Sequence, residues 1–182
     1  MIEPPQKPPR FGFTRGDRFI PYPKWISDVL RLGLLFPLAV VTRGMTLGAQ
    51  VLVRNTDGDV LLIKQSYSAV WQFPGGGVDR AESIYEAAER ELKEEAGVLC
   101  NSPPTLLGLY TNFSTFPGDH VAFFEATDWH QPIIPEPNAE IIAQGFFPVD
   151  DLPENTARSV RRRLSERIGN VEIACEWTPS TD

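Results

Sequence analysis

Apolar residues in the middle of the chain come in short runs that are separated by turn signals. Residues 46–54 and 60–64 are two such runs around an Asp-Gly turn, and they predict two strands joined as a hairpin. Further strands are predicted at residues 105–113 and 120–126 and near residues 145–147. Because these strands occur among helical patterns, the sequence predicts a mixed β-sheet flanked by helices.

A long helical pattern follows a stretch of proline and glycine. Pro74 and the glycines at 75–77 cannot lie inside a helix, so they predict a loop whose bare backbone lets a ligand approach closely. Strong helix formers occupy residues 80–96, with Asp79 placed to cap the amino end and Gly97 placed to stop the carboxyl end. The sequence therefore predicts a loop followed directly by a long helix.

The carboxylates of this helix continue its apolar stripe instead of opposing it. At about 100° per residue, Ile84, Ala88, Glu91 and Glu95 fall on nearly one line, with Glu94 to one side. Clustered carboxylates repel one another and resist burial, so a hard divalent cation such as Mg²⁺ or Mn²⁺ is their natural partner. A solvated acidic face is the alternative and is typical of charge runs, but it suits Glu91 and Glu95 poorly.

The same residues resemble the signature of the Nudix hydrolases, a MutT-like family with the pattern G-x5-E-x7-R-E-U-x-E-E-x-G-U, where U is a bulky aliphatic residue. Every fixed place is filled, by Gly76, Glu82, Arg90, Glu91, Leu92, Glu94, Glu95, Gly97 and Val98. The resemblance is sharpest over residues 71–98 and extends loosely over residues 46–168. It implies an α/β fold, the Nudix-type α/β/α sandwich with a mixed β-sheet flanked by helices.

The resemblance also implies a function. It implies a metal-dependent pyrophosphohydrolase that cleaves a nucleoside diphosphate linked to another moiety by attack of water, with Mg²⁺ or Mn²⁺ as the cofactor. The implied residues are Gly76, Glu91, Glu94 and Glu95 for the metal, Gly75, Gly76 and Gly77 for the substrate, and Glu91, Arg90 and Glu140 for catalysis. A non-catalytic Nudix module that binds a nucleotide metabolite or a partner protein is the alternative, although such modules usually have an eroded signature.

Several individual roles stay open. Glu91 either binds the metal or orients or deprotonates the attacking water, and Arg90 is expected to hold a carboxylate of the signature through a charge-assisted hydrogen bond. Glu82 is about equally consistent with a cap in the helix dipole and with an indirect role at the metal. Glu140, with Glu136 as the second choice, is the expected further ligand or base from a late loop, and a solvated loop acid is the alternative.

The length of the chain indicates how it is divided. Its 182 residues predict one Nudix hydrolase domain at residues 46–169, preceded by an N-terminal arm and helix at 1–45 and followed by a C-terminal tail at 170–182. The apolar run at 26–41 is interrupted by charged residues and proline and is too short to span a membrane. This run is interpreted as a buried helix or an interaction segment, with membrane association as the alternative, and a cytoplasmic protein that does not bind a membrane is expected.

Charge and cysteine content narrow the expected partners. A formal net charge of −7 argues against a surface that coats nucleic acid, so the expected partner is a nucleotide-type diphosphate small molecule and not a nucleic acid. The two cysteines are too few for a disulfide framework, and no cluster of Cys and His suggests zinc. A homodimer is compatible with the sequence, and no residue pattern identifies the nucleoside.

The remaining segments give weaker signals. Proline-rich residues 1–24 predict an extended arm with aromatic anchors, residues 25–35 predict a helix, and residues 129–138 predict a loop. A last helix at 157–168, with Asn155 or Thr156 as its cap, is expected to present its arginines as a solvated face with salt bridges, with a phosphate-binding surface as the alternative. Residues 171–177 predict a strand or a packed tail. Structural roles are expected for His120, Phe113, Phe116 and Trp129.

Overall fold

The structure is a computed structural model that describes residues 12–15, 18–21, 44–115, 117–169 and 171–178. The chain divides into one compact unit at Met1–Gly44 and a second at Met45–Asp182.

The first unit contains an antiparallel pair of strands, β1 (Gly12–Arg15) and β2 (Arg18–Pro21), where the sequence predicts an extended arm. The helix expected at 25–35 and the apolar run at 26–41 lie outside the described residues. Among the residues that are described, no helix is both long enough and apolar enough to cross a bilayer.

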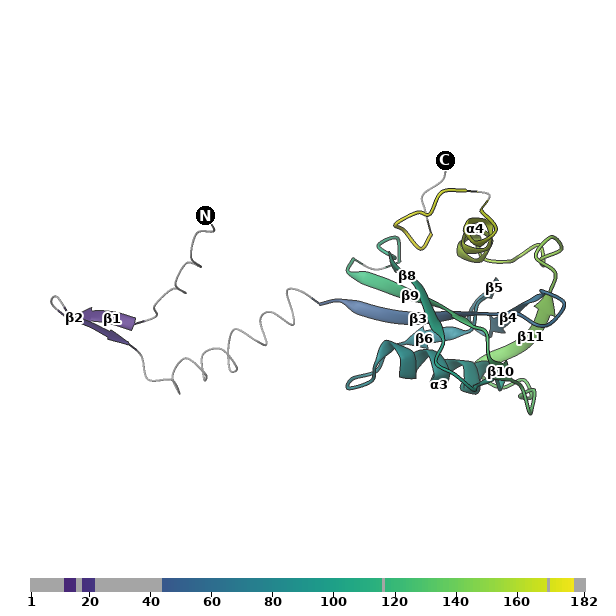
Figure 1. The fold of residues 1–182 in the computed structure, drawn as a ribbon, viewed down its shortest axis with the longest axis horizontal. Coiled ribbons are helices and arrows are strands. Elements are labelled where there is room, and N and C mark those ends of the chain that lie inside the picture. The colour runs from purple at the N-terminus through teal and green to yellow at the C-terminus, as the bar shows by residue number, and fades with distance from the viewer. Residues whose placement is uncertain (1–11, 16–17, 22–43, 116, 170, 179–182) are drawn as a thin grey trace, which may run out of the picture. The chain divides into compact units, whose positions relative to one another are not determined.

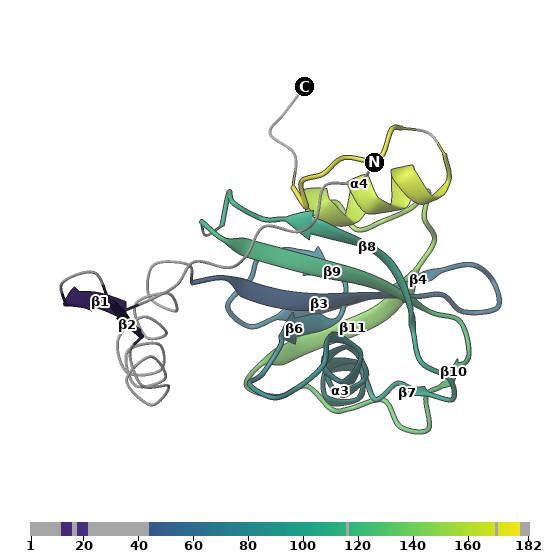
Figure 2. The ribbon, with the colours of Figure 1, turned by 60° about the vertical axis from the view of Figure 1, so that its left-hand side comes forward.

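The second unit places helices α3 (Ile84–Ala96) and α4 (Arg158–Arg167) on opposite sides of its strands, as Figure 1 and Figure 2 show. One sheet has the order β6 (Gly75–Gly77), β3 (Thr46–Val53), β9 (Asp119–Ala126) and β8 (Thr105–Thr111), with β3 and β9 parallel and the other pairs antiparallel. The other sheet has the order β11 (Ile141–Phe147), β4 (Val60–Gln65) and β5 (Trp71–Gln72). The predicted mixed-sheet α/β/α arrangement is confirmed.

The central strands are buried on both faces because each helix covers one side. Val51 and Val53 of β3 belong to a core cluster with Leu92 of α3, whereas Leu52 between them belongs to a second cluster with Leu164 of α4. Successive side chains of a strand point to opposite faces. The continuous apolar runs of the sequence therefore correspond to strands that are covered on both sides.

The predicted hairpin at residues 46–64 is wrong in its pairing. The turn itself forms, because Asn55 Oδ1 accepts hydrogen bonds from the N–H groups of Asp57 and Asp59, and Gly58 has a φ of 87°. Beyond this turn, however, β3 and β4 enter different sheets, and β4 pairs with β5 and β11. Pairing with distant segments therefore replaces the local pairing that the turn suggests.

Two predicted loops contain short strands. Gly75–Gly77 forms β6 and pairs with residues 48–50 of β3, and Trp129–His130 forms β10 and pairs with β7 (Leu99–Cys100). Neither segment has an apolar pattern that indicates a strand. Both segments become strands because their backbone groups form hydrogen bonds with a neighbouring strand.

Helix α3 begins at Ile84 instead of at Arg80. Its N-cap is Ser83, whose hydroxyl accepts from the N–H of Glu86 at 3.2 Å while the Glu86 carboxylate accepts from the N–H of Ser83 at 2.8 Å. This reciprocal pair is a capping box, and it fixes the start of the helix.

The expected cap Asp79 belongs to the preceding turn. Its N–H donates to Glu82 Oε2 at 2.9 Å, and Ala81, with a φ of 65°, interrupts the helical backbone between this turn and the capping box. The predicted stop is confirmed, because Gly97 has a φ of 68° and its N–H bonds to the carbonyl groups of the last helical turn.

Helix α4 does not use either cap that the sequence suggests. Its N-cap is Ala157, which makes no side-chain hydrogen bond. Asn155 Nδ2 donates instead to the carbonyl of Ala69 at 2.7 Å, and the Thr156 hydroxyl donates to the carbonyl of Pro153 at 2.7 Å. Both side chains therefore fasten the segment that precedes the helix.

The expectation of a solvated arginine face on α4 is wrong for Arg163, whose side chain is 0% exposed. Its guanidinium carbon lies 4.1 Å from the ring centre of Tyr110 and 5.6 Å from that of Trp177. Its Nη2 donates to Glu166 Oε1 at 2.9 Å and to the carbonyl of Glu176 at 3.2 Å. Residues 171–178 thus match the predicted alternative of a packed tail at Trp177, which is buried and covers the arginine.

Replacing Glu166 by alanine is expected to lower the free energy of unfolding by about 3 kcal/mol, because it leaves the buried Arg163 charge without its partner. Glu166 Oε1 also accepts from Arg162 and from the N–H of Ala174, so the change also loosens the tail. Urea unfolding measures the effect. Glu172→Ala, at an exposed position on the same tail, is the control, and equal unfolding midpoints for the two variants would contradict the ion-pair argument.

Candidate active site

A cleft of about 420 Å³ lies where β3, β6 and the amino end of α4 meet the C-terminal tail. Its lining is largely polar and includes Gln50, Gln72, Asn112 and Asp119. The carboxylate of Asp119 accepts from the hydroxyl of Thr46 at 2.6 Å and from Asn112 Nδ2 at 2.7 Å. A cleft of this size and polarity suits a small polar ligand.

Strand β6 forms part of the cleft wall and also touches helix α3. Gly76 and Gly77 line the cleft, and a Cβ atom added to Gly76 would lie 2.7 Å from Glu91 Cδ. Gly75 has a φ of 147°, and a Cβ atom added there would lie 2.8 Å from the Cα of Gln50. Close packing within the protein thus requires glycine at positions 75 and 76. Of the three glycines, Gly76 and Gly77 line the cleft and Gly75 does not.

Glu95 is a buried carboxylate on the face of α3 that meets β6. Its side chain accepts from the N–H of Gly75 at 2.6 Å and from Gln65 Nε2 at 3.1 Å. Burial raises the pKa of Glu95 to about 7, and these two hydrogen bonds oppose the rise without cancelling it. The negative charges of Glu91 and Glu140 raise the pKa further, so both of them act on this carboxylate.

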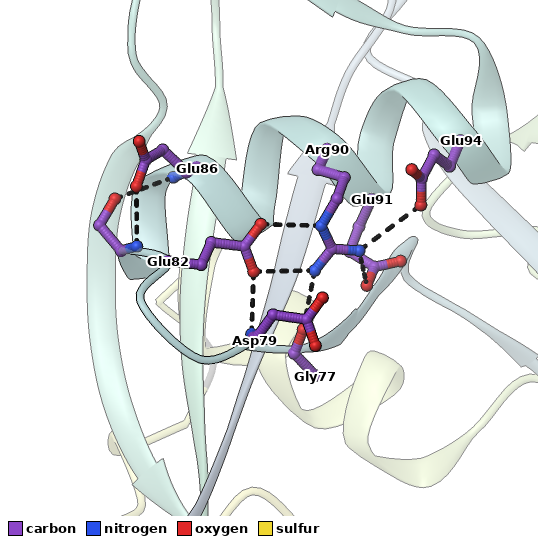
Figure 3. A network of polar contacts seen from close by, with 8 residues as sticks. Gly77, Asp79, Glu82, Glu86, Arg90, Glu91 and Glu94 are labelled. Carbon is purple, nitrogen blue, oxygen red and sulfur yellow. Dashed lines mark hydrogen bonds and ion pairs between the residues drawn. The ribbon is translucent and has the colours of Figure 1, made fainter.

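Arg90 joins three acids of the signature, Glu82, Glu91 and Glu94, into one network, as Figure 3 shows. Its Nε and Nη2 donate to the two oxygens of Glu82 at 2.8 and 2.9 Å, and its Nη1 donates to Glu91 Oε1 at 2.7 Å. Its Nη2 also donates to the carbonyl of Gly77 at 2.9 Å. The bonds from Arg90, together with the one from the N–H of Asp79, lower the pKa of Glu82 to about 2, so Glu82 acts here as the anchor of Arg90 and not as a helix cap.

The carboxylates of the signature differ in their surroundings. Burial is the main reason that the pKa of Glu91 is raised, and Arg90 opposes that rise. The side chain of Glu94 is 61% exposed, and its Oε2 lies 3.5 Å from Arg90 Nη1. Within the described part of the chain, no three Asp, Glu, His or Cys side chains converge closely enough to hold a metal ion as they stand. The structure therefore places Glu91 and Glu95 together and leaves Glu94 turned toward Arg90.

Residues outside the signature include some with the structural role that the sequence predicts and others that the sequence did not select. Trp129 donates from Nε1 to the carbonyl of Arg54 and stacks on Phe146, which agrees with a structural role. His120 contacts the carbonyl of Gly118 and does not line the cleft, and Phe116 lies outside the described residues. The structure adds three polar residues near the acids or in the cleft that the sequence reasoning did not select, namely Gln65, Tyr67 and Gln72.

Gln65 and Tyr67 have no distinct sequence signal, because both precede residues 71–98, where the resemblance is sharpest, whereas Gln72 lies within that stretch but outside the fixed positions of the signature. The Tyr67 residue as a whole is 72% exposed. Partial desolvation of its hydroxyl and the negative charges of Glu140, Glu95 and Glu91 raise the pKa of that hydroxyl. Its phenol therefore lies close to the acidic group. Only the tertiary arrangement brings this loop residue next to α3.

Comparisons with known proteins agree with this geometry. A family model described as the NUDIX domain matches residues 45–168. The crystal structure of a MutT NUDIX hydrolase from Burkholderia pseudomallei superposes with a TM-score of 0.57 and 28% sequence identity, covering 66% of this chain and 95% of that chain.

Curated relatives match over shorter segments. A provisionally named 8-oxo-dGTP diphosphatase of Bacillus subtilis (strain 168) is 48% identical over 52 residues, which cover 29% of this chain and 35% of that protein. An RNA pyrophosphohydrolase of Psychrobacter cryohalolentis is 42% identical over 55 residues, which cover 30% of this chain and 32% of that protein. The match thus spans about a third of the length of these two relatives.

The buried carboxylate of Glu95 is expected to make the metal-free protein less stable as the pH rises. Its folded pKa of about 7 lies above the ordinary value of 4.5, so the folded protein binds the proton more tightly than the unfolded chain, and the free energy of unfolding falls between these values. From about pH 5 to about pH 8, wild type should lose about 2 kcal/mol relative to Glu95→Gln, which has no proton to release.

Urea unfolding of both proteins in the presence of a metal chelator measures this difference. The Gln variant serves as the reference because every other titrating group is common to the two proteins. Parallel stability profiles over this pH range would show that Glu95 is not a desolvated acid.

Proposed function

Because this chain belongs to the NUDIX family, we propose that it is a metal-dependent pyrophosphohydrolase that cleaves a nucleoside diphosphate linked to another moiety. The observation that supports this most directly is the position of strand β6 between the cleft and helix α3. Gly76 and Gly77 line the cleft, while the same strand contacts Glu91, Glu95 and Arg90 on the side of α3. A nucleotide in the cleft would therefore be separated from these carboxylates by β6 alone, and its diphosphate would reach them by extending past this edge strand.

The proposed cation ligands are Glu91, Glu94, Glu95 and the carbonyl oxygen of Gly76. All are oxygen donors, which Mg²⁺ and Mn²⁺ prefer. Glu91 and Glu95 are acids whose pKa values are raised by burial, and a bound cation would favour their ionised forms. Glu94 would join by turning its exposed side chain away from Arg90. When bound, the cation would neutralise phosphate charge and assist the attack of water.

The chain's own residues would hold the reacting groups and accept a proton. Attack of water on a phosphorus atom breaks one P–O bond of the diphosphate, and the water must lose a proton. Glu140 is the proposed acceptor, because its exposed side chain can pass the proton to solvent and its charge acts on both Glu91 and Glu95. Glu91 is the alternative base. Arg90 would keep Glu91 in place through its hydrogen bond of 2.7 Å.

Glu94→Gln and Glu95→Gln are each expected to reduce kcat by at least about a hundredfold with little loss of folding, because a neutral amide is a poor ligand for a hard cation. Phosphate release in the presence of Mg²⁺ or Mn²⁺ measures turnover, and circular dichroism checks the fold. Glu89→Gln is the matched control on the same helix, because Glu89 is exposed. Retained turnover in both variants would refute the assignment.

A substrate panel distinguishes the proposed activity from a non-catalytic module. It should contain nucleoside triphosphates, sugar nucleotides, dinucleotides and, because two relatives are named an RNA pyrophosphohydrolase and an m7GpppN-mRNA hydrolase, triphosphorylated and capped RNA. Product masses identify the bond that is cleaved. If the whole panel is inert but nucleotides still bind, the alternative of a nucleotide-binding module without catalysis replaces the proposal.

Asp119→Asn is expected to raise KM by about tenfold while kcat stays within about twofold, because it removes a charged hydrogen-bond acceptor from the cleft and leaves the carboxylates of α3 intact. Steady-state kinetics with the best substrate of the panel measures both constants. Asp128→Asn is the control, since Asp128 also accepts from an amide, that of Asn101 at 2.8 Å, but does not line the cleft. A fall in kcat with an unchanged KM would contradict the placement of the substrate.

A further inference from the structure

Two glutamine side chains connect the cleft to the carboxylate of Glu95. Gln72 lines the cleft, and its Nε2 donates to Gln65 Oε1 at 2.5 Å. Gln65 Nε2 in turn donates to Glu95 Oε1 at 3.1 Å. Gln65 is only 7% exposed, so its amide is a buried polar group that must be hydrogen-bonded to be tolerated. These two hydrogen bonds therefore give a partner to both the carbonyl oxygen and the NH₂ group of the buried Gln65 amide.

Gln65 is one of two groups that orient the Glu95 carboxylate. The other oxygen, Oε2, accepts from the N–H of Gly75 at 2.6 Å, and Gly75 is fixed by its pairing with Gln50 of β3. A carboxylate held at both oxygens cannot rotate freely about its last bond. Loss of the Gln65 amide would leave Glu95 attached at one oxygen only.

The direction of these hydrogen bonds follows from the charge of Glu95. When Glu95 is ionised, as a bound cation would make it, its carboxylate can only accept, so Gln65 must turn its NH₂ group toward Glu95 and its carbonyl toward Gln72, as it does here. Gln72 must then donate from its own NH₂ group, which leaves its carbonyl oxygen, Oε1, for another donor. Within the part of the chain that the structure describes, no group donates to Gln72 Oε1. The cleft thus offers an acceptor whose orientation is set by Glu95.

We propose that Gln65 and Gln72 are positioning residues, which orient Glu95 for the cation and link that orientation to the contents of the cleft. A ligand group that donates a hydrogen bond, such as a ribose hydroxyl or an exocyclic amine, is the partner that Gln72 Oε1 would accept. The proposal rests on the proposed function, because orientation of Glu95 matters for binding only if Glu95 is a cation ligand.

Mn²⁺ binding to the substrate-free protein tests the proposal without any turnover. Titration followed by electron paramagnetic resonance should give an affinity about tenfold lower for Gln65→Met than for wild type, as is usual when a group that supports a metal ligand is lost. Gln72→Met should weaken binding less. The double variant should match Gln65→Met alone, because Gln72 acts only through Gln65.

Two controls separate this proposal from its alternatives. Gln144→Met is the matched substitution, since Gln144 accepts from Gln131 on another part of the surface, and it should bind Mn²⁺ as wild type does. Urea unfolding of all variants measures any general loss of stability. Gln72 does not contact Glu95 and is partly exposed, so Gln72→Met remains informative even if Gln65→Met fails to fold.

The outcomes distinguish failure of this proposal from failure of the proposed function. If Glu95→Gln abolishes Mn²⁺ binding but Gln65→Met and Gln72→Met bind as wild type, the glutamines do not position Glu95 and the proposal is overturned. An additive double variant would also overturn it. If Glu95→Gln itself binds Mn²⁺ normally, the proposed cation site is wrong. A raised Mg²⁺ requirement with nearly normal kcat at saturating Mg²⁺ would support the proposal in the active enzyme.

Discussion

The close approach of a glycine backbone to helix α3 is the constraint on which the site depends. Gly75 packs against the backbone of β3 in a conformation with φ of 147°, and the space beside Gly76 is filled by the carboxylate of Glu91. Any side chain at these two positions would push β6 away from β3 or from α3. Because the glycines of β6 have no side chains, this one strand forms the cleft wall on one side and contacts the buried acids on the other.

The electrostatics of α3 follow from the same contact. Packing against β6 removes Glu91 and Glu95 from water, which raises the pKa of both acids. Arg90 compensates part of this charge and is itself anchored by Glu82. The network therefore holds a negative centre that is only partly neutralised, which is the condition under which a buried acidic group gains most from a divalent cation. The spacing of the signature has a physical counterpart in this arrangement, in which the Arg90 guanidinium lies among several acids.

The C-terminal tail contributes to the cleft through a different interaction. Trp177 lines the cleft, and it is held there by the buried guanidinium of Arg163 and by a hydrogen bond from its N–H to the carbonyl of Thr111 in β8. Glu166 ties the same arginine to the tail. The shape of the cleft thus depends on residues far from the signature, which explains why the signature alone does not identify the ligand.

The sequence by itself determined the helix that carries the acids, its stop at Gly97, the face on which Glu91 and Glu95 lie, and most of the strands, because these follow from local periodicity and backbone preference. Only the tertiary structure decided that the glycines form a strand, that Arg163 is buried, and that Gln65 reaches Glu95. Each of these depends on a partner distant in the chain, and a local pattern has no information about such a partner.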